Sequence, residues 1–199
     1  MERSERRRLL RRGLWLEYAT LGWNVLEGAL VLWAAWGARS IGLAGFGLDS
    51  LIEIFASIVV VWQLTGVDKA REARAMRAIG AAFFVLGANI VGQFAFSLIS
   101  ATRPAPSLLG MASLTATIIA MLLLSWAKRN TGRRLNNPVL LAESRVTLVD
   151  ALLASTVLAG VGLNALFGWW WADPLSGLVI VYYAIMEGRA AWSHQSTAA

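Results

Sequence analysis

Acidic residues stand inside long apolar runs of this sequence, where an ionised side chain is costly to place. Asp49 and Glu53 are four residues apart, so a helix would put them on one face, one turn from each other. Two adjacent carboxylates repel, and without a cation at least one of them should hold a proton. The pair therefore predicts a cation-binding site.

Two other apolar runs carry further buried polar groups. Glu143 and Asp150 are seven residues apart and would share a face, with Asp150 at mid-depth. In the first run Asn24 and Glu27 share a face, and Glu17 lies two turns earlier. A structural ion-pair network would need a lysine or arginine at similar depth, and the pattern predicts none. We therefore expect a cation or proton pathway, with protonated acids acting as interhelical hydrogen-bond donors as the alternative.

The available side chains restrict the chemistry to oxygen ligands. The chain has no cysteine, and its single histidine, His194, lies in the last few residues. Carboxylates suit harder divalent ions such as Mn²⁺ or Fe²⁺, and Zn²⁺ also accepts them. Ligands must be deprotonated, so metal ions and protons compete for one site. A membrane enzyme would need a nucleophile and base or histidine-rich ligands, so we expect no enzyme and no prosthetic group.

The elements that must position these residues are membrane-spanning helices, so the fold class is an all-α polytopic membrane protein. Hydrophobic residues make up 57% of the 199 residues and charged residues 15%. Six runs approach the roughly 20 residues that cross a bilayer. The predicted spans are Leu14–Trp36, Ile41–Leu64, Ala78–Ser100, Leu108–Trp126, Val139–Phe167 and Pro174–Trp192. Residues 1–13 would be a basic cytoplasmic segment, 14–192 the six-helix domain and 193–199 a short cytoplasmic tail.

Basic residues predict the orientation of the spans. All lysines and arginines except Arg39 and Arg103 fall on the side that holds both termini. This bias places the termini and the segments 66–77 and 128–137 in the cytoplasm and predicts an inner (plasma) membrane protein. The net charge of +6 borders the spans and is not interleaved with stacking aromatics, so no nucleic-acid partner is expected.

Tryptophans support the same spans, since indole favours the headgroup level of a bilayer. Most of them fall near a predicted boundary: Trp15, Trp62, Trp126 and Trp192 on the inner side, Trp33, Trp36 and residues 169–171 on the outer side. Trp23 alone lies in the interior of a predicted span, away from its boundaries.

Several segments resemble the transmembrane domain of the cation diffusion facilitator (cation efflux) family of metal/proton antiporters. Residues 23–27 read WNVLE, residues 39–53 read RSIGLAGFGLDSLIE and residues 171–175 read WADPL. Asp49 and Glu53 match the two metal-binding acids of the family's second helix, and Asp150 matches the aspartate of its fifth. Val146 stands where the family usually has a histidine, which removes the softest ligand. Short bacterial relatives and the vertebrate transmembrane protein 163 group are similar in the same stretch.

The resemblance implies a proton-coupled efflux antiporter for a divalent metal of the Zn/Mn/Fe/Co class. Zinc is the first expectation for the transported ion, and manganese or iron are the alternatives. The implied metal ligands are Asp49, Glu53 and Asp150, with Glu143 as a fourth oxygen ligand in place of the histidine. The residues expected to support the ligands or to carry protons are Asn24, Glu27 and Glu17.

The resemblance also implies an arrangement of the helices. The first, second, fourth and fifth would form a bundle, with the third and sixth as a pair, in a homodimer. Gly80, Gly87 and Gly92 of the third would permit close packing. The family's cytoplasmic C-terminal domain would be missing, which makes this a short form. A non-transporting membrane scaffold derived from such a transporter is the alternative function.

Overall fold

The computed structural model describes residues 3–38, 41–66, 68–100, 108–167 and 172–193, and the elements in these ranges are all α-helices. The helices are α1 (Arg3–Ala38), α2 (Ile41–Thr65), α3 (Lys69–Ser100), α4 (Leu108–Leu135), α5 (Pro138–Phe167) and α6 (Ala172–Ser193). The prediction of six helices is confirmed. Arg39, Arg103, His194 and residues 169–171 lie outside the described residues.

The predicted bounds need correction at one end of three helices. α1 begins at Arg3, well before Leu14, and α3 begins at Lys69. α4 continues to Leu135, although its span was predicted to end at Trp126. Hydropathy marks only the apolar part of a helix, whereas arginine, lysine and alanine are good helix formers and continue it beyond that part.

The connection between α4 and α5 is a tight turn with a specific geometry. Asn136 has a φ of 51°, the left-handed conformation that commonly ends a helix. The next residue caps α5, because the Leu140 N–H donates to Asn137 Oδ1 at 3.0 Å. Pro138 follows at the first helical position. The turn makes α4 and α5 antiparallel neighbours, so Lys128 and Glu143, at similar distances from it, come face to face.

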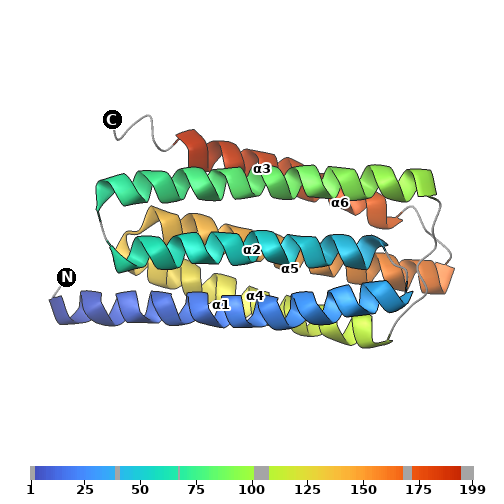
Figure 1. Ribbon diagram of the computed structural model, residues 1–199, viewed down its shortest axis with the longest axis horizontal. Coiled ribbons are helices and arrows are strands. Elements are labelled where there is room, and N and C mark those ends of the chain that lie inside the picture. Colours follow the sequence, from blue (N-terminus) through green and yellow to red (C-terminus); the bar gives the residue numbers. More distant parts are fainter. Residues whose placement is uncertain (1–2, 39–40, 67, 101–107, 168–171, 194–199) are drawn as a thin grey trace.

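The helices form a four-helix bundle with a helix pair beside it (Figure 1). α1 contacts α2 and α4, and α5 contacts the same two helices. α3 and α6 pack against each other and lie along α2 and α5. This confirms the predicted grouping of helices 1, 2, 4 and 5 with helices 3 and 6 as a pair.

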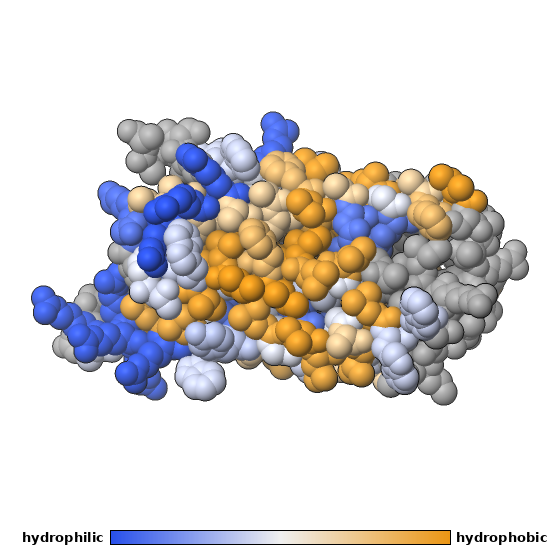
Figure 2. Space-filling model, viewed as in Figure 1, coloured by the Kyte–Doolittle hydropathy of each residue, from blue (hydrophilic) through white to orange (hydrophobic). Residues whose placement is uncertain are grey.

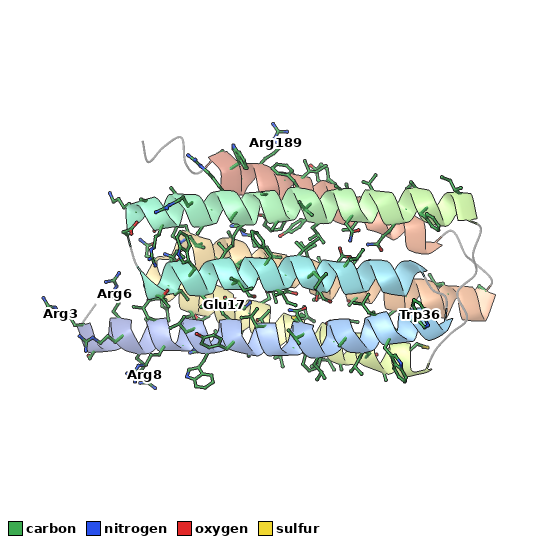
Figure 3. The ribbon with its side chains drawn as sticks, in the orientation of Figure 1. Arg3, Arg6, Arg8, Glu17, Trp36 and Arg189 are labelled. Atoms are coloured by element: carbon green, nitrogen blue, oxygen red, sulfur yellow. The ribbon has the colours of Figure 1, made fainter. Side chains whose placement is uncertain are left out.

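Both described ends of the chain lie at the same end of the molecule. α1 begins there, α6 ends there, and the connections from α2 to α3 and from α4 to α5 lie there too (Figure 1). We call it the basic end, because Arg3, Arg6 and Arg8 project from it (Figure 3). The even number of passes predicted from the charge pattern is thus confirmed for the described helices.

The molecule exposes large apolar side chains between its ends and buries many polar ones beside its hydrophobic core, unlike a soluble protein. Leu26 and Leu123 are 60% and 63% exposed, whereas Asn24 and Gln63 are fully buried. Figure 2 shows an apolar surface between the ends, with hydrophilic side chains gathered at the basic end. Lipid favours this distribution because it offers the surface no hydrogen bonds. The chain is therefore a helical membrane protein.

Length and composition alone mark three helices as able to cross a membrane. Within the described residues these stretches are Gly47–Thr65, Lys69–Phe96 and Met111–Leu135. α1 and α5 carry several of the buried acids, which lower their mean hydropathy. Two tryptophans near the predicted span boundaries are exposed, Trp15 by 74% and Trp36 by 88%, as a position among lipid headgroups requires.

Glycines allow α3 and α6 to approach closely. A Cβ on Gly80 would lie 3.3 Å from the backbone oxygen of Gly188, and one on Gly87 would lie 3.7 Å from the Ala184 Cβ. A Cβ on Gly92 would meet nothing within 4 Å. Two of the three glycines predicted to permit close packing thus serve a contact within the chain.

Candidate cation-binding site

Four carboxylates gather in the interior of the four-helix bundle. They are at most 4% exposed, and we call them the central acids: Glu27 of α1, Asp49 and Glu53 of α2, and Asp150 of α5. Asp150 interacts electrostatically with the other three. The helical spacing noted in the sequence explains this, since each helix presents one acidic face to the bundle interior.

Glu53 and Asp150 lie against each other and meet no N–H or hydroxyl donor in hydrogen-bonding geometry. This holds for both oxygens of each carboxylate. Asn24 and Thr147 lie beside Glu53, and the Asn24 side chain donates to the Thr20 carbonyl at 3.0 Å. Buried polar atoms almost always have a partner, and a buried charge needs one more than a neutral group does. A cation bound here would supply that partner.

Asp49 is held from outside the bundle, by α3. Asn89 Nδ2 donates to Asp49 Oδ1 at 2.6 Å, and Gln93 Nε2 donates to Asp49 Oδ2 at 3.3 Å. Two amide donors stabilise the negative charge of this carboxylate and fix its orientation. The helix pair therefore contributes to the site, which the sequence pattern did not predict. The signal was the spacing of Asn89 and Gln93, four residues apart on one face.

Glu27 is bound by a short chain of hydrogen bonds. The Thr117 hydroxyl of α4 donates to Glu27 Oε1, and Trp23 Nε1 donates to Thr117 Oγ1 at 3.3 Å. Glu27 Oε2 has no partner. The hydrogen bond gives the indole N–H of Trp23 a partner in the interior of its span, away from the headgroup level predicted for the other tryptophans.

A second cluster lies nearer the basic end, and we call it the lysine site. Lys128 of α4 is fully buried, and its Nζ lies 2.6 Å from Glu143 Oε1 of α5 and 3.2 Å from Glu17 Oε2 of α1. The ammonium also donates to Thr147 Oγ1 at 3.1 Å. Ser57 of α2 donates to Glu143 Oε1 at 3.2 Å. Figure 3 shows Glu17 on the side of α1 that faces α2.

The lysine site corrects one expectation from the sequence. Residues 128–137 were predicted to lie beyond the fourth span in the cytoplasm, and α4 continues through them to Leu135 with the Lys128 side chain fully buried. The corrected expectation is that the buried acids lack a basic partner, because Lys128 is one. The spacing was a signal in the sequence, because Lys128 is seven residues after Met121 and three after Ser125, which puts all three on one face of a helix. The structure buries Met121 and Ser125, and Lys128 with them.

The predicted metal ligands are divided between the two clusters. Asp49, Glu53 and Asp150 are central acids, whereas Glu143 binds Lys128. Of the residues predicted to support them, Glu27 is itself a central acid and Asn24 lies beside Glu53. Glu17 lies in the lysine site. In the described ranges, no three acidic or histidine side chains are close enough to hold one metal ion together. The ligand set stays a prediction.

The six-helix bundle with acids in its interior places the chain in the general class of polytopic membrane proteins with buried polar groups. Residues 29–193 match the family model described as the cation efflux transmembrane domain, and the chain belongs to this family. The resemblance inferred from the sequence is thereby confirmed. The matched range includes every central acid except Glu27.

One curated relative is the uncharacterized transporter sll1263 of Synechocystis sp. (strain ATCC 27184 / PCC 6803 / Kazusa). It is 27% identical over 160 residues, which cover 75% of this chain and 52% of the relative. The chain therefore spans about half the length of the curated relative it matches.

Proposed function

We propose that the chain exports a divalent transition-metal cation across the membrane in exchange for protons. The observation that carries the proposal is the pair Glu53 and Asp150, two buried carboxylates whose four oxygens have no hydrogen-bond donor. A cation supplies what these oxygens lack. The family match supports cation transport as the general activity.

In the proposed mechanism Asp49, Glu53 and Asp150 bind the metal ion directly. Three ionised carboxylates in a low-dielectric bundle repel one another, and a divalent ion offsets two of the three charges. Asn89 and Gln93 hold Asp49 in place, while Glu53 and Asp150 move toward the ion. Glu143, the fourth ligand predicted from the sequence, is bound to Lys128 and is not assigned to this ion.

Exchange follows from the competition between metal ions and protons for the same carboxylates. The metal-bound form and the protonated form both keep the net charge of the site small. The empty ionised form is unfavourable in the membrane. The protein would therefore reorient when loaded with either species and not when empty, by rocking of the bundle between inward-open and outward-open forms.

The proposed substrate is zinc first, with manganese or iron as alternatives. Val146 in place of the family's histidine leaves an all-oxygen ligand set, which favours the harder ions more than a mixed set would. Flux of Zn²⁺, Mn²⁺, Fe²⁺ and Co²⁺ into proteoliposomes would rank them. The ion with the largest flux that also stabilises the purified protein is the substrate.

Metal-dependent thermal stabilisation tests the site without requiring transport. A saturating divalent ion should raise the melting temperature of the native protein, and Asp49→Asn should abolish this rise while the protein remains inserted. Asp68→Asn is the matched control, because Asp68 is exposed and asparagine preserves its capping role. A native protein without any metal-dependent rise would favour the scaffold alternative.

We further propose that the basic end faces the cytoplasm of an inner (plasma) membrane, following the positive-inside rule. The chain contains no cysteine, so single cysteines are direct probes. Lys69→Cys and Arg133→Cys should resist impermeant thiol reagents added outside, whereas Ala105→Cys should react. Labelling of position 69 from outside would show that the basic end faces outward, opposite to the proposed orientation. A homodimer is also proposed, from the family resemblance, and light scattering in detergent would test it.

A further inference from the structure

The lysine site has the composition of a cation-coordination shell. Lys128 Nζ donates to Glu143 Oε1 and to Thr147 Oγ1, and it forms an ion pair with Glu17 Oε2. Ser57 completes the shell by donating to Glu143, so every helix of the four-helix bundle contributes one or more groups. The side chains around the ammonium come from three other helices: Glu17 from α1, Ser57 from α2, and Glu143 and Thr147 from α5. Such a shell needs long-range packing and is not a local helix contact.

Some oxygens of this shell are not satisfied by Lys128. Glu143 Oε2 has no hydrogen-bond partner, and neither oxygen of Glu17 has one. Both belong to residues that are fully buried. An ammonium group carries one charge, whereas the shell offers two carboxylates. The shell therefore matches a divalent cation better than it matches the lysine.

The lysine site also lies on the path that an ion would take. Glu143 is seven residues before Asp150 on α5, which is about 10 Å along the helix toward the basic end. The lysine site therefore lies between the central acids and the basic end. Lys128 interacts electrostatically with Glu53, so a cation that reaches Glu53 repels the ammonium.

We propose that Glu17, Glu143, Ser57 and Thr147 form a second cation-binding site. The Lys128 ammonium fills it as a tethered cation, and a divalent metal ion takes its place when Lys128 moves out. The two carboxylates then pass the ion between the central acids and the basic end. This inference rests on the proposed transport function for its role, but not for the binding site itself.

Counting bound ions tests the second site. Zn²⁺ and Mn²⁺ bound per chain are measured by equilibrium dialysis of the purified protein in detergent. Lys128→Met removes the tethered charge at similar volume and should add a second ion per chain. Lys128→Met with Glu143→Gln should lose this added ion. Lys69→Met, the same change at the exposed lysine, should add none. A Lys128→Met protein that binds no more ions than the native chain would overturn the inference.

The Asp49→Asn background separates this inference from the proposed function. Lys128→Met should still gain an ion there, because the second site does not use Asp49. If the native chain bound no ion at the central acids, yet Lys128→Met bound one that Glu143→Gln removed, the proposed function would fail and the second site would stand. If the native chain binds one ion and Lys128→Met binds no additional ion, the proposed function stands and the second site fails.

Lys128→Arg covers the case in which Lys128→Met does not fold. Arginine keeps the charge but holds carboxylates with a fork of paired hydrogen bonds, so it should leave the site more slowly. Metal flux should fall about tenfold, while affinity at the central acids stays within about twofold. Native flux in Lys128→Arg would contradict the proposal that the ammonium is displaced during transport. Arginine could replace a purely structural charge without slowing metal flux.

Discussion

The central acids and the lysine site contain the same kind of side chain at similar burial, but their partners differ. Glu17 and Glu143 share the Lys128 ammonium, and Glu143 also accepts hydrogen bonds from the hydroxyls of Ser57 and Thr147. Glu53 and Asp150 receive neither in hydrogen-bonding geometry. The same helix makes the difference, because α4 places Lys128 near the basic end and the neutral Thr117 beside Glu27.

This contrast separates a resident cation from a cation that must come from outside the protein. A buried carboxylate is tolerated when its charge is compensated. The covalently attached Lys128 ammonium compensates that charge for as long as its side chain stays in place. A hydroxyl such as Thr117 orients a carboxylate without neutralising it. The central acids therefore need a diffusible ion or a proton, and the lysine site supplies its own.

The largest expected effect is on transport by the central acids. Asp150→Asn removes a carboxylate that has no other partner and should reduce metal flux by more than about 100-fold, beyond the loss typical for groups that only support a ligand. Flux into proteoliposomes at matched protein density measures it. The exposed Asp68→Asn should retain the native flux. Native flux in Asp150→Asn would remove this residue from the ligand set.

Stability should change in the opposite direction at the two clusters. Lys128→Met leaves two buried carboxylates without a cation and should lower the free energy of unfolding by about 3 kcal/mol in metal-free buffer. Asp150→Asn removes an uncompensated charge and should leave stability unchanged or raise it. Chemical unfolding of both variants in detergent compares them, with Lys69→Met as the control. Equal losses at both positions would show that the two clusters do not differ as described.

The smallest expected effect concerns the amides that orient Asp49. Asn89→Ala removes the 2.6 Å hydrogen bond and should weaken metal affinity about tenfold, with the longer bond from Gln93 contributing less. Titration calorimetry would measure it. Asn130→Ala, near the basic end of α4, is the matched control and should bind like the native chain. Unchanged affinity in Asn89→Ala would mean that α3 only packs against the site.

Much of the fold was predictable because lipid imposes simple rules. Six apolar runs and a one-sided charge distribution were enough for six helices with both ends on one side, and the family resemblance added their grouping. The central acids could be selected because Asp49, Glu53 and Asp150 stand alone in apolar surroundings at helical spacing.

The partners of these acids were harder to predict. Lys128 stands between Trp126 and Arg129, a context typical of a headgroup boundary, and only the rotation of α4 directs it inward. The contact of Asn89 with Asp49 likewise depends on how α3 is rotated against α2. Hydropathy carries no information about such rotations, so contacts between helices had to come from the structure.

Uphill metal movement tests the central claim most directly. In proteoliposomes with an acidic lumen, outward proton flow should drive the external metal ion into the lumen above its outside concentration. Apparent affinity should fall at least about tenfold as the pH drops from about 7.5 to about 5.5, because protons compete for the carboxylates. Glu53→Gln should lose the uphill movement. Metal flux that ignores both the proton gradient and the pH would contradict exchange at the central acids.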